Sequence, residues 1–155
     1  MEIKRGDLVL LGIDYFTRMI FGKSLTTKDS SKICDFIKEV HLNFPIDTLL
    51  TDNGREFHNE KPKAWCNEKG IKQIFSVPYY HQSNGRIERA NRTIREALKH
   101  SKGPTKVVLA NIIKNYNNSE HRGIGMTPNE GLKKENHEHI IERQEKYRKE
   151  FIIKK

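Results

Sequence analysis

Six consecutive residues, Leu8–Ile13, are apolar or glycine and run directly into a carboxylate, Asp14. An uninterrupted run of this kind is typical of a central strand that is buried on both faces of a sheet. After a polar turn, residues 19–25 are again mostly apolar and predict an antiparallel return strand, so a meander of two or three strands is expected here. The first of these strands, over residues 8–13, constrains the fold most, because it implies a sheet and places the charge of Asp14 at the end of the strand.

Helical and extended patterns alternate after this meander. A helix is predicted by a cap at Asp29 or Ser30 and by residues that recur at steps of three and four and stop before Pro45. These residues are Ile33, Cys34, Ile37, Val40 and His41, all apolar except the histidine. Residues 46–51 predict a short strand, and the following Asp52-Asn53-Gly54 favours a tight turn with a positive φ. A short helix between Pro62 and Gly70 and a strand over 71–77 come next. This order predicts an α/β fold with a mixed sheet.

The second half of the chain is predicted to be mainly helical. Residues 78–85 are turn-forming and indicate a mobile loop, after which Ile87, Asn91, Ile94 and Leu98 mark a helix that should end near Gly103. Residues 107–116 have the length of another helix, which together with Trp65 belongs to the core or to a dimer interface, and Pro128 begins a short turn. We divide the chain into a core, 1–132, and a charged terminal helix or tail, 133–155, that is partly frayed.

The net charge and the composition of the chain limit the classes of partner that it can bind. The 155 residues are the size of one domain, and 29 Lys and Arg against 20 Asp and Glu leave a formal net charge of +9. Such an excess indicates a polyanionic partner, nucleic acid before acidic lipid. The longest apolar run is far below the roughly 20 residues of a membrane span, and Cys34 and Cys66 form no CxxC pair that would indicate zinc or a disulfide framework. We expect an intracellular protein with reduced, buried thiols, no membrane partner and no small-molecule substrate.

Three carboxylates form the predicted chemical centre. Asp14 and Asp52 each follow an apolar strand, and Glu88 lies early in the helix after the glycine-containing loop. Grouped carboxylates in a cationic protein repel one another unless a cation lies among them, and oxygen ligands select Mg²⁺ or Mn²⁺. Two such ions about 3.5–4 Å apart would serve the attacking and the leaving oxygen of an in-line phosphoryl displacement. Singly, each residue has an ordinary structural role, as a turn or helix-terminus acid.

The helix that carries Glu88 also carries cations. Arg92, Arg95 and Lys99 fall four, seven and eleven residues after Glu88 and therefore share its face. Arg86 and Arg89 add charge nearby, and Asn91 is a further candidate for contact with DNA. Phosphate contacts supply most of the affinity for a duplex, so this face suits DNA, although a solvated helix face is the alternative.

These residues lie in segments that together resemble the catalytic core of retroviral and gypsy-like LTR-retrotransposon integrases. That group belongs to the DDE transposases and has a ribonuclease-H-like fold. The resemblance covers residues 8–132 and rests on residues 12–18 (Gly-Ile-Asp-Tyr-Phe-Thr-Arg), 50–57 (Leu-Thr-Asp-Asn-Gly-Arg-Glu-Phe), 78–92 around Gln82-Ser83-Asn84-Gly85, and the later Tyr116-Asn117 and Met126-Thr127-Pro128. His81 departs from the family pattern, which usually has proline there. The zinc-binding domain and carboxy-terminal barrel of such proteins are not visible, which indicates a core fragment or a protein without those modules.

The resemblance implies the following expectations. The fold is a mixed five-stranded sheet flanked by helices. Asp14, Asp52 and Glu88 bind two metal ions and catalyse DNA 3′-end processing and strand transfer. Arg92 and Arg95 contact the DNA ends of the element, and Gln82, Ser83, Asn84 and Gly85 form a flexible active-site loop. The protein assembles into dimers or larger complexes with element and target DNA, in the nucleus when it acts on target DNA.

Three rival functions remain open at this stage. A host-adopted relative would keep the fold and the basic face as a DNA-binding protein without catalysis. The transposase core of an insertion sequence would share both the triad and the loop. A ribonuclease-H-like nuclease would cleave the RNA of hybrids without joining strands.

Overall fold

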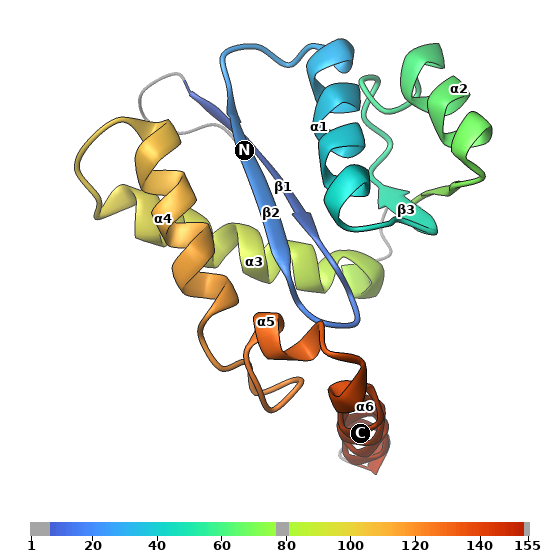
Figure 1. Cartoon of the computed structure of the whole chain (residues 1–155), viewed down its shortest axis with the longest axis vertical. Helices are drawn as coiled ribbons and strands as arrows, with labels where there is room; N and C mark the ends of the chain where they lie inside the picture. The colour runs from blue at the N-terminus through green and yellow to red at the C-terminus, as the bar shows by residue number, and fades with distance from the viewer. Residues whose placement is uncertain (1–6, 77–80, 154–155) are drawn as a thin grey trace. The chain divides into compact units, whose positions relative to one another are not determined.

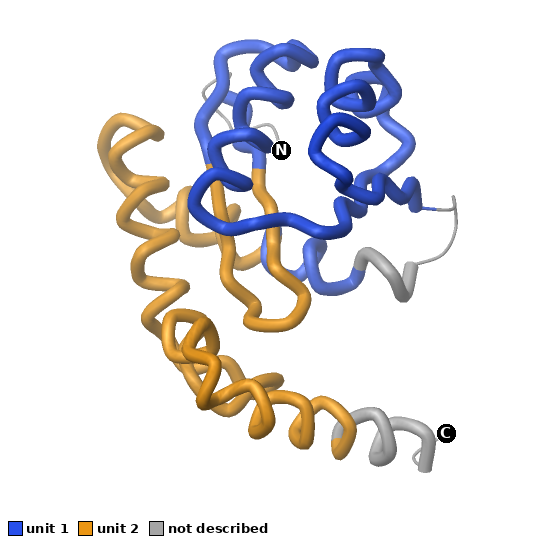
Figure 2. Tube along the Cα trace, turned by 45° about the vertical axis from the view of Figure 1, so that its right-hand side comes forward, with its two compact units in different colours: residues 1–10, 23–91 blue, residues 11–22, 92–155 orange. Residues whose placement is uncertain are grey.

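A computed structural model describes residues 7–76 and 81–153 of the chain (Figure 1). Its strands are β1 (Leu8–Ile13), β2 (Ile20–Leu25), β3 (Thr48–Thr51) and β4 (Lys72–Phe75). Its helices are α1 (Ser30–Asn43), α2 (Glu60–Lys69), α3 (His81–Lys99), α4 (Thr105–Asn117), α5 (Pro128–Gly131) and α6 (His137–Ile153), with a 3₁₀ turn, η1 (Lys134–Asn136). The contacts divide the chain into two compact units, unit 1 with residues 1–10 and 23–91 and unit 2 with residues 11–22 and 92–155 (Figure 2).

The strands confirm the predicted α/β class but not the predicted five-stranded sheet. In the described residues β1 pairs with β2, and β3 pairs with β4 in parallel with Thr48 opposite Lys72 and Thr51 opposite Phe75. The turn between β1 and β2 is too short for a parallel crossover, so these strands form a hairpin. Among the strands of residues 7–76 and 81–153, each pairs with the next strand along the chain, which gives two ladders of two strands. In β1 only Val9 is buried, so the predicted burial of both faces is wrong.

Unit 1 is built around the predicted helix α1. The Asp29 carboxylate caps it by accepting a hydrogen bond of 3.0 Å from the Ser31 amide. The core consists of Leu25, Ile33 and Ile37, with the partly buried Leu8, Leu10, Ile46, Leu49, Phe57 and Trp65 packed against it. Helix α2 ends as predicted at Gly70, whose φ of 69° is the left-handed conformation that glycine adopts without strain.

Unit 2 has its own core, in which Ile94, Ile124 and Ile140 are completely buried. Helix α4 matches the predicted helix over 107–116. Pro128 begins α5, which Thr127 and Glu130 close with a reciprocal capping box. Ile140 belongs to α6, so this part of the predicted tail packs into unit 2, and the domain boundary at residue 132 stays a prediction.

None of the helices in the described ranges is long and apolar enough to cross a membrane. The buried apolar residues of α3 lie on one face of the helix. In α3, Ala90, Ile94 and Leu98 are buried at helical spacing, whereas Glu88 and Arg89 are exposed. This α3 pattern confirms the predicted helical period, although the helix ends at Lys99 and not near Gly103.

Candidate active site

Asp14 lies in the turn that joins β1 to β2, where its carboxylate is held by one residue. Asp14 Oδ2 accepts hydrogen bonds from the Thr17 amide at 2.8 Å and the Thr17 hydroxyl at 2.6 Å. The backbone closes the same turn, because the Asp14 amide donates to the Met19 carbonyl and the Arg18 amide donates to the Asp14 carbonyl. Arg18 has a φ of 65°, a left-handed conformation that is uncommon for a residue other than glycine. Asp14 Oδ1 has no hydrogen-bond partner within the described residues.

Asp52 follows β3, and its neighbour Asn53 connects the two parallel strands. The Asn53 side-chain amide donates to the Ser76 carbonyl at 2.6 Å, just beyond the end of β4, while the Ser76 amide donates to the Thr51 carbonyl at 2.8 Å. His58 stacks on Phe75 with ring centroids 4.1 Å apart, beside the same strand end. Asp52 is therefore carried on a backbone that is fixed at the carboxyl ends of both strands.

Gly54 lets two neighbouring carboxylates approach closely, and its backbone angle does not require glycine. The predicted positive φ is wrong, since the positive-φ glycines of the described chain are Gly70, Gly103 and Gly125. The Gly54 amide instead donates to Asp52 Oδ1 at 2.9 Å. A Cβ atom at Gly54 would lie 2.8 Å from the Glu56 carboxyl carbon and 2.9 Å from Asp52 Oδ1. The two carboxylates therefore occupy the space that any side chain at residue 54 would need.

Glu88 is exposed on α3, as are Arg89, Arg92, Arg95 and Lys99. Arg86 and Asn91 are half-buried. Carboxylate and cations thus lie along one helix, as the spacing predicts. The contacts of these cations with DNA stay predictions.

The predicted active-site loop is replaced by helical backbone. Helix α3 begins at His81, so Gln82, Ser83, Asn84 and Gly85 form its first turns, and the predicted start near Ile87 is wrong. Gly85 does not have a positive φ, and a Cβ there would meet nothing within 4 Å. Neither the backbone angle nor steric contact at Gly85 therefore disfavours a helix. The remaining cost is the low helix propensity of glycine, which is about 1 kcal/mol less favourable than that of alanine. The tyrosines at 79 and 80 lie outside the described residues.

The three predicted ligands have the right chemistry for a divalent metal ion. Asp14 and Asp52 each keep one carboxylate oxygen without a partner in the described ranges, and the Glu88 carboxylate accepts no hydrogen bond there. Hard oxygen donors of this kind fit Mg²⁺ or Mn²⁺. No group of three or more His, Cys, Asp or Glu residues that could hold a metal ion occurs in the part of the chain that the structure describes. Asp14 belongs to unit 2, whereas Asp52 and Glu88 belong to unit 1.

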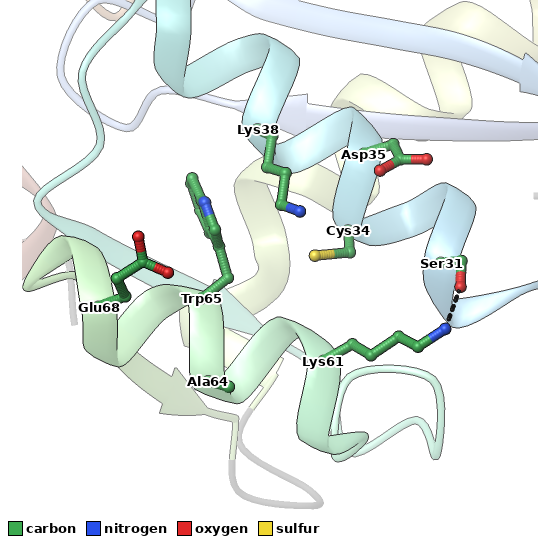
Figure 3. Close-up of a pocket in the computed structure, with 8 residues that line it drawn as sticks. All are labelled: Ser31, Cys34, Asp35, Lys38, Lys61, Ala64, Trp65 and Glu68. Atoms are coloured by element: carbon green, nitrogen blue, oxygen red, sulfur yellow. Dashed lines mark hydrogen bonds between the residues drawn. The ribbon is translucent and has the colours of Figure 1, made fainter.

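A separate pocket of about 410 Å³ lies within unit 1, between α1 and α2, and none of the predicted site residues lines it (Figure 3). Cys34 and Lys38 point from α1 toward α2, and Lys61 of α2 donates to the Ser31 hydroxyl at 2.8 Å. Both cysteines are free and buried, as predicted. Burial, and then the neighbouring Cys34, raise the pKa of the Cys66 thiol above its ordinary value, which keeps this thiol protonated.

Sequence reasoning missed several residues around the candidate site. The pattern around Thr17 predicts only a polar turn, although a threonine three residues after an aspartate can also indicate a turn closed by side-chain hydrogen bonds. The sequence around Asn53 predicts a turn but not the hydrogen bond of its side chain to the Ser76 carbonyl. The proximity of Glu56 to Asp52 has no local signal, because it arises from the path of the chain around Gly54.

Comparison with known proteins agrees with this architecture. The family model for the Integrase core domain matches residues 4–81, half of the chain. The catalytic core domain of BIV integrase superposes with a TM-score of 0.74 and 19% identity, covering 84% of this chain and 87% of that one. A chain of the simian T-cell lymphotropic virus intasome in complex with PP2A regulatory subunit B56 gamma gives a TM-score of 0.77 and 16% identity, covering 86% of this chain and 51% of that one. The chain therefore belongs to the integrase core domain family, and its fold is that of the ribonuclease-H-like integrase catalytic cores.

Proposed function

We propose that this chain is the catalytic core of an integrase, a polynucleotidyl transferase that processes DNA 3′ ends and transfers them into target DNA. Its family membership supports a role in DNA integration. The proposal of 3′-end processing and strand transfer is supported by the carboxylate oxygens of the predicted triad, Asp14, Asp52 and Glu88, that are free within the described residues. Asp14 and Asp52 follow two different strands, and each retains an oxygen that no described residue binds, while Glu88 is exposed on a cationic helix.

Asp14, Asp52 and Glu88 would hold Mg²⁺ or Mn²⁺, two ions in all. Such ions supply Lewis-acid stabilisation of the charge on the attacking and leaving oxygens of a phosphoryl transfer. The protein orients these ligands, through Thr17 for Asp14 and through the Gly54 amide for Asp52. No covalent protein intermediate is needed, so the chain requires no nucleophilic side chain.

The exposed cations of α3 would bind the DNA backbone beside Glu88. Phosphate contacts position a duplex without reading its sequence, so Arg92, Arg95 and Lys99 would orient the scissile phosphate rather than select a target sequence. One similar structure is the catalytic core domain of BIV integrase, and the other is a simian T-cell lymphotropic virus intasome. We propose by analogy that this chain forms dimers or larger complexes with element ends and target DNA, in the nucleus when it acts there.

The test is Mn²⁺-dependent strand joining, and its reversal on a branched DNA substrate, with the wild-type chain and Asp52→Asn. Asp47→Asn is the matched control, because Asp47 is an exposed aspartate just before β3 whose side chain makes no hydrogen bond within the described residues. We expect activity from the wild type and Asp47→Asn, none from Asp52→Asn, and equal thermal stability for all three. Equal activity of Asp52→Asn would refute the proposed triad. Tight DNA binding by all three proteins without any joining would favour the adopted DNA-binding protein instead.

A further inference from the structure

The hydroxyl group of Thr17 has a fixed orientation. Thr17 is 3% exposed, and its Oγ1 accepts a hydrogen bond of 3.2 Å from the Met19 amide. Because that bond uses a lone pair, the hydroxyl proton remains for Asp14 Oδ2, at 2.6 Å. Hydrogen bonds to a carboxylate are short and about twice as strong as those between neutral groups. Thr17 therefore fixes one oxygen of Asp14 and leaves the other without a partner within the described residues.

Helix α6 contacts the same turn from a distant part of unit 2. The Gln144 side-chain amide donates to the Phe16 carbonyl at 3.1 Å, across 128 residues of sequence. The His137 ring meets the Phe16 ring edge-on, with centroids 5.0 Å apart and an interplanar angle of 81°. Figure 1 shows α5 and the start of α6 beside the turn between β1 and β2. Two residues of α6 thus hold the residue just before Thr17.

Gly131, at the end of α5, lies between the turn and α6. A Cβ atom there would be 3.3 Å from Cδ1 of Ile140 and 3.5 Å from Cβ of Thr17. Ile140 is completely buried. Thr17 is therefore packed against the segment that leads into α6, where a Cβ atom at residue 131 would already be in contact with Thr17 and Ile140.

We propose that Thr17 is a positioning residue for the Asp14 carboxylate, and that α6 keeps Thr17 in place through Gln144 and His137. This inference rests on the proposed function, because it gives the orientation of Asp14 a purpose in metal binding. It also makes residues 137–144 part of the catalytic unit, although the matched family model ends at residue 81. Partners of metal ligands outside the ligand set commonly change metal affinity by 10–100-fold when they are removed.

The first experiment measures Mn²⁺ binding by isothermal titration calorimetry on the full chain, without DNA. Thr17→Val removes the hydroxyl at nearly constant volume, and we expect Mn²⁺ to bind about 10-fold more weakly. Thr17→Ser keeps the hydroxyl and should bind Mn²⁺ within about threefold of the wild type, a rescue that a packing role alone would not produce. Thr51→Val is the matched control, because the buried Thr51 hydroxyl has no hydrogen-bond partner in the described chain. Wild-type affinity in Thr17→Val would overturn the proposal.

The second experiment tests α6 with Gln144→Ala and its exposed neighbour Glu145→Ala. We expect Gln144→Ala to weaken Mn²⁺ binding severalfold and Glu145→Ala to leave it unchanged. Unchanged binding in Gln144→Ala would refute the role of α6, and this variant decides the proposal if Thr17→Val does not fold.

The variant Asp14→Asn distinguishes a failure of the positioning role of Thr17 from a failure of the proposed metal-binding triad. If Asp14→Asn loses Mn²⁺ binding while Thr17→Val keeps it, only the positioning role fails. If Asp14→Asn binds Mn²⁺ as the wild type does, Asp14 is not a ligand, and the proposed triad fails with it.

Discussion

The side chain of Asn117 substitutes for a strand at the free edge of β2. Its Oδ1 accepts from the Ile20 amide and its Nδ2 donates to the Ile20 carbonyl, both at 3.0 Å. Asn117 is 8% exposed and Ile20 is 1% exposed, so water does not replace these bonds easily. Asn117→Ala would leave two buried backbone groups of one residue unpaired.

The expected cost follows from those two groups. An unsatisfied buried donor or acceptor costs about 1–3 kcal/mol, so two cost about 2–6 kcal/mol before the structure relaxes. We expect about 3 kcal/mol, because a water molecule that enters the space left by the amide would recover part of the loss. For a domain of this size each kcal/mol lowers Tm by about 2–4 °C, so the predicted fall is about 6–12 °C.

The assay is urea denaturation followed by far-ultraviolet circular dichroism. Asn115→Ala is the control on the same helix, because Asn115 is exposed and its side chain makes no hydrogen bond within the described residues. We expect Asn115→Ala to change the free energy of unfolding by less than about 0.5 kcal/mol. The slope against urea should be equal for all three proteins. A loss below about 1 kcal/mol in Asn117→Ala would refute the reasoning that this amide completes the edge of β2.

Three further predictions concern DNA binding, the Asp52 turn and α5. Arg92→Ala should weaken DNA binding uniformly across sequences and reduce the slope of log affinity against log salt by about 1 in a fluorescence anisotropy titration. Gly54→Ala should cost less than about 1 kcal/mol of stability, because only the ends of flexible side chains obstruct the new methyl, but should impair strand joining by displacing the Asp52 carboxylate. Hydrogen bonds, first from the Thr127 amide and then from its hydroxyl, lower the pKa of Glu130 below its ordinary 4.5. Wild type should therefore be more stable than Glu130→Gln above that pH, and the difference should vanish as pH falls through the lowered pKa in urea melts at several pH values.

Each of these predictions has a matched control in the chain. Lys63→Ala removes one exposed cation from α2 and should leave the salt slope unchanged. Gly12→Ala, in β1, introduces a methyl with nothing within 4 Å and should not impair strand joining. Glu142→Gln alters an exposed glutamate of α6 and should show no such pH-dependent difference. An effect in any control as large as in its partner would contradict the corresponding prediction.

Local signals in the sequence determined most of the secondary structure. The cap at Asp29, the glycine at residue 70 and the apolar spacing of residues 107–116 placed α1, α2 and α4 correctly, because capping and helical periodicity depend on residues within one or two turns. Helix α3 starts earlier than the sequence predicts, because the turn-forming residues 82–85 are compatible with either loop or helix and their local preferences are weak.

By itself the sequence also determined that Asp14 and Asp52 follow strands and that Glu88 shares a helix with cations, since these are matters of order and spacing. Only the tertiary structure decided which distant side chains hold the strands and turns next to Asp14 and Asp52. Asn117 reaches Ile20 across 97 residues and Gln144 reaches Phe16 across 128, and Asn53 joins the ends of β3 and β4. No local pattern encodes such contacts, because a polar side chain finds a buried partner only after the chain has packed and excluded water from the backbone groups that remain unpaired.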